Sequence, residues 1–172
     1  MARAIIVADT SVLINFLRID RMDLIGAHPD SFIATDHVAA EIADTYPDQQ
    51  TRYNAALKAG LLAEHRIDDT VELELFLRMA ERGRLGAGER SAIAVALNRR
   101  CALGIDDSRA IQRAIEEAGI AGRTILIVRT QDIVVELIKQ GVLSIEAADA
   151  IHVDWATNHR FKLKITSFRE VL

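Results

Sequence analysis

The sequence predicts an α/β fold, namely a three-layer α/β/α sandwich with a mainly parallel central sheet. Short apolar or β-branched runs alternate with longer stretches of helical period. The runs show no polar alternation, so both faces of each strand should be buried, as in a parallel sheet with helices on either side. With 172 residues, half of them hydrophobic, the chain is expected to form one domain spanning 1–172.

Four runs are predicted to be strands: 4–8, 32–34, 101–105 and 124–128. Thr10 or Ser11 offers an N-cap for a helix after the first strand, and Asp36 does the same after the second. Gly86 precedes a third helix and Ser108 opens a fourth. Further helices are expected over 49–60, 70–82, 131–140 and 144–158, whereas 61–67 and 161–172 carry no clear pattern.

Composition excludes several classes of protein. The formal net charge of −4 lacks the basic character of a metal-free, purely electrostatic nucleic-acid binder. The single cysteine, Cys101, can form neither an internal disulfide nor a multi-thiolate metal site. No stretch approaches the roughly 18 uncharged apolar residues of a membrane helix. We therefore expect a cytoplasmic protein that does not associate with a membrane.

Acidic residues follow two of the predicted strands. Asp9 ends the first strand, and the pair Asp106 and Asp107 ends the strand over 101–105. The carboxyl ends of parallel strands meet at one edge of the sheet, where open α/β proteins bind their ligands. These three carboxylates are therefore expected at the same edge.

Two glutamates lie on otherwise apolar helix faces. Glu41 is beside Ile42, and Glu89 shares a stripe with Ile93. Burying a carboxylate without a partner costs several kcal/mol, so each glutamate needs a cation or a water-filled cleft. Converging carboxylates would repel one another unless a cation joined them. Oxygen ligands without Cys or clustered His favour Mg²⁺ or Mn²⁺.

The acids and their flanking residues resemble the PIN-domain family. The segments that carry the resemblance are VADTSVL at 7–13, VAAEI at 38–42, LGAGERSAI at 85–93 and GIDDSR at 104–109. The segment LGAGERSAI, together with the acidic pair at 106–107, is most similar to a branch of this family that is related to VapC-type toxins. The resemblance implies a metal site formed by Asp9, Glu41, Glu89 and one of the acidic pair, with Asp107 favoured and Asp106 second.

A competing register places the third acid at Asp149. The segment ADAIH at 148–152 is also similar to a helix found in VapC-type toxins. That register requires a later strand ending in Asp, yet 164–168 contains none. We therefore interpret Asp149 as a helix-surface or capping residue.

Other polar residues near the acids are candidates for supporting roles. Thr10, Ser11 and Asn15 could hydrogen-bond a metal ligand or water, and arginine side chains could receive phosphate as bidentate donors. The candidate arginines are Arg90, Arg109 and Arg113.

The resemblance implies metal-dependent hydrolysis of RNA phosphodiester bonds, in which Mg²⁺ or Mn²⁺ activates water and stabilises the leaving oxygen. It further implies the toxin of a toxin–antitoxin pair, a homodimer and an antitoxin protein partner. The alternative is a catalytically silent PIN-like module that binds RNA or a protein.

Overall fold

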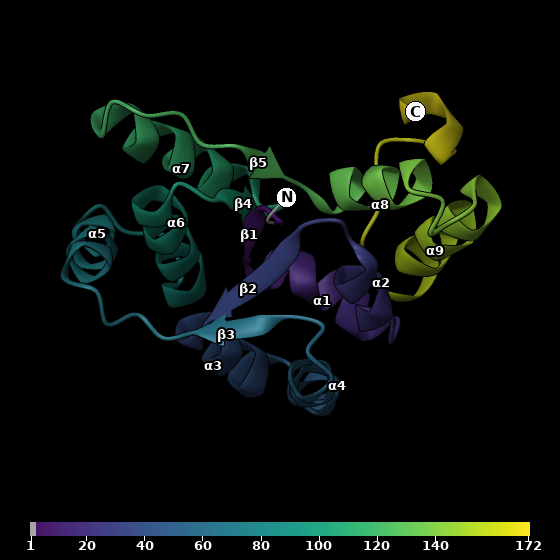
Figure 1. Ribbon diagram of the computed structural model, residues 1–172, viewed down its shortest axis with the longest axis horizontal. Coiled ribbons are helices and arrows are strands. Elements are labelled where there is room, and N and C mark those ends of the chain that lie inside the picture. Colours follow the sequence, from purple (N-terminus) through teal and green to yellow (C-terminus); the bar gives the residue numbers. More distant parts are fainter. Residues whose placement is uncertain (1–2) are drawn as a thin grey trace.

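The computed structural model describes residues 3–172 and contains a parallel five-stranded sheet (Figure 1). The strand order is β3-β2-β1-β4-β5, and each pair of neighbours is parallel. The strands are β1 Ile5–Ala8, β2 Ser31–Thr35, β3 Ala63–His65, β4 Ala102–Gly104 and β5 Ile127–Val128. The central strand β1 pairs with β2 on one side and with β4 on the other, so its carboxyl end lies in the middle of one sheet edge.

Helices cover both faces of this sheet, which confirms the predicted α/β class. Their bounds are α1 Thr10–Arg18, α2 Met22–Ala27, α3 Asp36–Thr45, α4 Pro47–Lys58, α5 Thr70–Glu81, α6 Ala87–Arg99, α7 Ser108–Ile120, α8 Thr130–Lys139 and α9 Ile145–Asn158. A short 3₁₀ helix, η1, covers Phe168–Val171 near the end of the chain. None of the helices within residues 3–172 combines the length and apolar character needed to cross a membrane.

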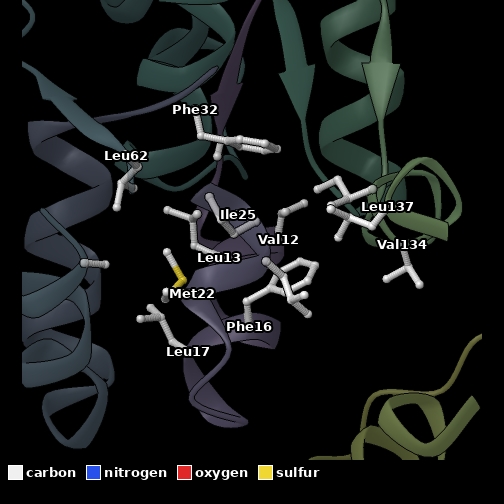
Figure 2. Packing of buried hydrophobic residues seen from close by; sticks show 14 of the residues in the cluster. Val12, Leu13, Phe16, Leu17, Met22, Ile25, Phe32, Leu62, Val134 and Leu137 are labelled. Atoms are coloured by element: carbon white, nitrogen blue, oxygen red, sulfur yellow. The ribbon is translucent and has the colours of Figure 1, made fainter. Parts of the chain in front are cut away.

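The alternating direction of side chains along β1 creates two hydrophobic cores. Ile6 and Ala8 face the core formed mainly by α1, α2, α8 and α9, and Val7 faces the core formed by α5, α6 and α7. Figure 2 shows part of the first core, where Phe16 of α1 lies among apolar side chains of the surrounding elements. The helices thus hold β1, and the residue that follows it, from both sides.

Several local predictions were wrong. Strand β3 and helix α2 were not predicted. Strands β1, β4 and β5 are shorter than the apolar runs that predicted them, whereas β2 extends one residue beyond its run at each end. Asp9, rather than Thr10 or Ser11, caps α1, because its side chain accepts a hydrogen bond from a backbone N–H of the first turn. Thr35 caps α3 through its side chain, and Asp36 is the first helical residue.

Candidate metal-binding site

The candidate site lies at the sheet edge where β1 and β4 end. The backbone N–H of Asp9 donates to the carbonyl of Gly104 at 2.8 Å, which joins the two strand ends. The carbonyl of Asp9 accepts from Val12 and Leu13 at the start of α1. Asp9 therefore sits at a rigid junction between strand and helix.

The carboxylate of Asp9 is buried and only half satisfied. The residue is 2% exposed, its Oδ2 accepts from Ser11 N at 3.0 Å, and its Oδ1 has no hydrogen-bond partner among residues 3–172. Burial raises the pKa of Asp9 from 3.8 to about 6, and the charge of Glu41 adds to the rise while hydrogen bonds from Ser11 oppose it. A buried, unpartnered carboxylate oxygen is one that a cation would stabilise.

Glu41 reaches the same region from α3. Its Oε2 accepts from Thr10 Oγ1 at 3.1 Å, which ties α3 to the first turn of α1. Gly88 of α6 leaves the room for this carboxylate, because a Cβ at that position would collide with Glu41 Oε2. Steric exclusion of a side chain by Glu41 thus explains the glycine at position 88.

Glu89 approaches from the first turn of α6. Its Oε2 accepts from Gly86 N at 2.9 Å. Burial raises the pKa of Glu89, and the negative charges of Asp9, Asp107 and Glu41 raise it further, against the hydrogen bond from Gly86. The charges of Asp9, Asp107 and Glu41 are therefore close enough to disfavour the ionisation of Glu89.

The two members of the acidic pair have different surroundings. Asp107 caps α7, with its Oδ1 accepting from Arg109 N at 3.0 Å and Ala110 N at 2.9 Å. These bonds use only Oδ1, and the charge of Asp107 acts on Glu89. The capping bonds of Asp107 therefore leave its Oδ2 unused, and its charge contributes to the acid cluster.

Asp106 is held by the scaffold instead. Its Oδ2 accepts from Thr130 Oγ1 at 2.6 Å and from Asn15 Nδ2 at 3.1 Å, while its Oδ1 accepts from Thr130 N at 3.0 Å. Its backbone N–H donates to Ser11 Oγ at 3.1 Å. Burial raises the pKa of Asp106, and the hydrogen bonds from Thr130 oppose the rise. Because both oxygens are engaged, Asp106 has less capacity than Asp107 for a metal.

A divalent ion fits these residues only as a partly hydrated one. Within residues 3–172, no group of three or more His, Cys, Asp or Glu side chains is arranged to hold a metal ion. Mg²⁺ commonly takes one or two carboxylates and keeps several waters, so a full protein cage is not required. The unpartnered Oδ1 of Asp9 would be one donor to such an ion, and Glu89 and Asp107 are candidates to hold its water shell.

The arginines proposed to bind phosphate occupy three different environments. The guanidinium of Arg90 lies 4.4 Å from the centre of the Phe76 ring, with its Nε buried and unpartnered among the described residues. Arg109 is exposed beside Asp107. Arg113 forms an ion pair with Glu117, so its charge is already neutralised.

Sequence reasoning missed Thr130 and misplaced two glutamates. Thr130 is fully buried and binds Asp106, but nothing in its segment indicates a contact with residues 24 positions earlier. Glu72 and Glu117 lie in polar stretches of the sequence, which favour a solvated helix face, yet they are 0% and 1% exposed. Arg99 neutralises Glu72 across 27 positions, a pairing that local sequence patterns do not reveal.

Asp149 has a structural role away from the acid cluster. Its Oδ2 accepts from Ser167 Oγ at 2.7 Å and its Oδ1 accepts from Phe168 N at 2.8 Å. Both oxygens therefore anchor η1 to α9, as expected for a capping residue.

Comparison with known proteins identifies the family. A family model described as a PIN domain (DUF3368) matches residues 5–164. The chain belongs to the PIN-domain family. PIN domains are generally nucleases and typically use divalent metals, and the match includes every acid of the cluster.

None of the curated proteins matches this PIN domain in sequence. Among solved structures, it is similar to a PilT N-terminus domain protein, SSO1118, from the hyperthermophilic archaeon Sulfolobus solfataricus P2. The two are 16% identical, with a TM-score of 0.49, over 75% of this chain and 89% of that chain.

Proposed function

We propose that this PIN domain is a metal-dependent endoribonuclease that hydrolyses RNA phosphodiester bonds with Mg²⁺ or Mn²⁺. The observation that supports the proposal most strongly is the carboxylate of Asp9. It is buried, one oxygen is unpartnered, and Glu41 raises its pKa further. A purely structural aspartate at a helix start would have no need of these acidic neighbours.

Asp9, Glu89 and Asp107 would hold the ion directly or through its water molecules, with Glu41 acting on its water shell. A bound divalent ion supplies two things to hydrolysis, namely a more acidic water and stabilisation of the leaving oxygen. Thr10 fixes the orientation of Glu41, and Gly86 N fixes that of Glu89. The protein thus fixes the positions of its carboxylates before RNA arrives.

Asp106 would act as a positioning residue. Its bonds to Thr130 and Asn15 hold the turn after β4, and this turn carries Asp107 toward Glu89. Arg90 is the best placed of the candidate arginines to receive a phosphate, because it follows Glu89 directly and no carboxylate within residues 3–172 pairs with it. Its contact with Phe76 keeps the guanidinium in place.

Cleavage of a labelled single-stranded RNA tests the proposal. Wild-type protein should cut with Mn²⁺ or Mg²⁺, stop in EDTA and recover when metal is restored. Asp9→Asn and Glu89→Gln should lose cleavage, whereas Asp149→Asn should retain it because Asp149 only anchors η1. Cleavage in EDTA, or full activity of Asp9→Asn, would contradict the proposed chemistry.

The silent-module alternative makes a different prediction for the same assay. A module that only binds RNA would retain the oligonucleotide with and without Mn²⁺ and never shorten it. The unpartnered oxygen of Asp9 favours the nuclease, because RNA binding alone would bring phosphate toward a set of negative charges.

A toxin role, an antitoxin partner and a homodimer remain parts of the proposal that stem from the resemblance to VapC-type toxins. Expression of the chain should arrest growth, and Asp9→Asn should not, if cleavage of cellular RNA is toxic. Co-expression with the product of an adjacent short reading frame should relieve the arrest. Light scattering after size-exclusion chromatography gives the oligomeric state.

A further inference from the structure

A recess lies at the opposite edge of the sheet from the acid cluster. It is a groove of about 1030 Å³ lined by the chain leading into β1, the end of α6, the start of β4 and the segment leading into β5. These segments lie together around the start of the described chain in Figure 1. The four residues of β1 separate the groove from Asp9, which corresponds to about 13 Å along the strand.

The lining of this groove contains three arginines and one carboxylate. Arg3, Arg100 and Arg123 face the recess, and Asp30 is the acidic residue of its lining. Within residues 3–172, none of the three arginines forms an ion pair. This excess of positive charge occurs in a chain whose formal net charge is −4. An anion would relieve the repulsion among the guanidinium groups.

The end of α6 accounts for only part of this charge. Arg123 donates from one nitrogen to the carbonyl of Leu97 at 2.8 Å, as expected for a cation at the negative end of a helix. Its remaining nitrogens, and those of Arg100, make no hydrogen bond to another side chain within residues 3–172. They are available to a ligand in the groove.

Arg100 keeps its side chain in an unfavourable backbone conformation. It caps α6 with φ 56° and ψ 41°, in the left-handed region where glycine is the usual residue. An arginine there has no conformational advantage over glycine. A role for the guanidinium itself would explain why this side chain is present.

The groove also has an apolar wall. Leu97, Ile125 and Leu126 line it, and Leu126 is 68% exposed. Adjacent guanidinium and aliphatic surfaces match a ligand that carries both a phosphate and a less polar part, as a nucleotide does. We propose that the groove binds a nucleotide phosphate, with the base against this apolar wall. The phosphate could belong to an RNA strand or to a free nucleotide, and only the choice of RNA rests on the proposed function.

Binding measured in EDTA tests this site separately from cleavage. The probes are a fluorescently labelled single-stranded RNA, followed by anisotropy, and AMP, followed by calorimetry. Arg100→Gly should weaken binding of at least one probe several-fold. Where RNA is the ligand, it should also lower the slope of log affinity against log salt by about 0.7 for one lost phosphate contact. Its melting temperature should not fall, because glycine suits the backbone at this position.

Arg160→Gly is the matched control. Arg160 is also exposed and has a positive φ of 54°, so the substitution makes the same change of charge and backbone away from the groove. It should leave binding unchanged. Arg3→Gln is a second groove variant that avoids the helix end, and it should weaken the same probe as Arg100→Gly.

The outcomes separate the two sources of phosphate from failure of the proposal. Weaker binding of RNA alone assigns the groove to an RNA strand, and weaker binding of AMP assigns it to a free nucleotide. The proposal is overturned if neither probe binds, or if Arg100→Gly and Arg160→Gly bind alike. Because EDTA prevents metal-dependent cleavage, none of these results depends on whether the acid cluster is catalytic.

Discussion

Replacing Asp9 with asparagine should stabilise the metal-free protein at neutral pH while removing its activity. The pKa of Asp9 is raised from 3.8 to about 6, which corresponds to about 3 kcal/mol at 1.36 kcal/mol per pH unit. Between these pH values the folded protein holds a proton that the unfolded chain has lost. The wild-type free energy of unfolding should therefore decrease as the pH rises from about 4 to 6, and level off above that.

The asparagine side chain has the size of the carboxyl group but no charge to lose. The difference in unfolding free energy between Asp9→Asn and wild type should grow from near zero at about pH 4 to as much as 3 kcal/mol at pH 7. For a chain of 172 residues this corresponds to an increase in melting temperature of about 6–12 °C. Urea unfolding in EDTA at several pH values measures it. An Asp9→Asn protein less stable than wild type at pH 7 would refute the reasoning.

Further predictions concern the ion and the neighbours of the acids. Millimolar Mn²⁺ should raise the melting temperature of wild type but not of Asp9→Asn, and an equal gain in both would argue against an ion at Asp9. Gly88→Ala should reduce cleavage at least tenfold with little loss of stability, because the new methyl group displaces only the flexible end of Glu41. Gly119→Ala, where a methyl group meets nothing within 4 Å, should cleave like wild type. Thr130→Val should lower the unfolding free energy by about 1–3 kcal/mol, since a buried acceptor loses its hydroxyl donor, and Thr130→Ser should restore it.

The central strands could be predicted because their residues are apolar on both faces. Ile6 and Val7 are buried in opposite cores, so an uninterrupted apolar run is what a central parallel strand requires. Strand β3 could not be predicted in this way, since Ala63 and Glu64 are exposed at the edge of the sheet. Its three residues pair with β2 through backbone hydrogen bonds, which carry no signal in the side chains.

The position of Asp9, Asp106 and Asp107 at one sheet edge could be predicted because it follows from topology. A carboxylate directly after β1 or β4 must lie at the shared edge of a parallel sheet, whatever the details of packing. The different surroundings of Asp106 and Asp107 could not be predicted, because Asp106 is held by Thr130, which lies 24 residues away. The burial of Glu72 likewise depends on Arg99, a partner in another helix.

The main chain of Asp9 maintains the fold at the junction of β1 and α1, whereas its side chain provides the candidate metal ligand. Its backbone N–H completes the pairing with β4 and its carbonyl begins α1, so the architecture depends on the main chain and not on the carboxylate. Asp9→Asn, which replaces one carboxylate oxygen with an amide nitrogen, should therefore remove the proposed activity and leave the fold unchanged. If the chain cleaves RNA as proposed, such a protein would allow an uncut RNA to be trapped and its path across the surface traced at atomic detail.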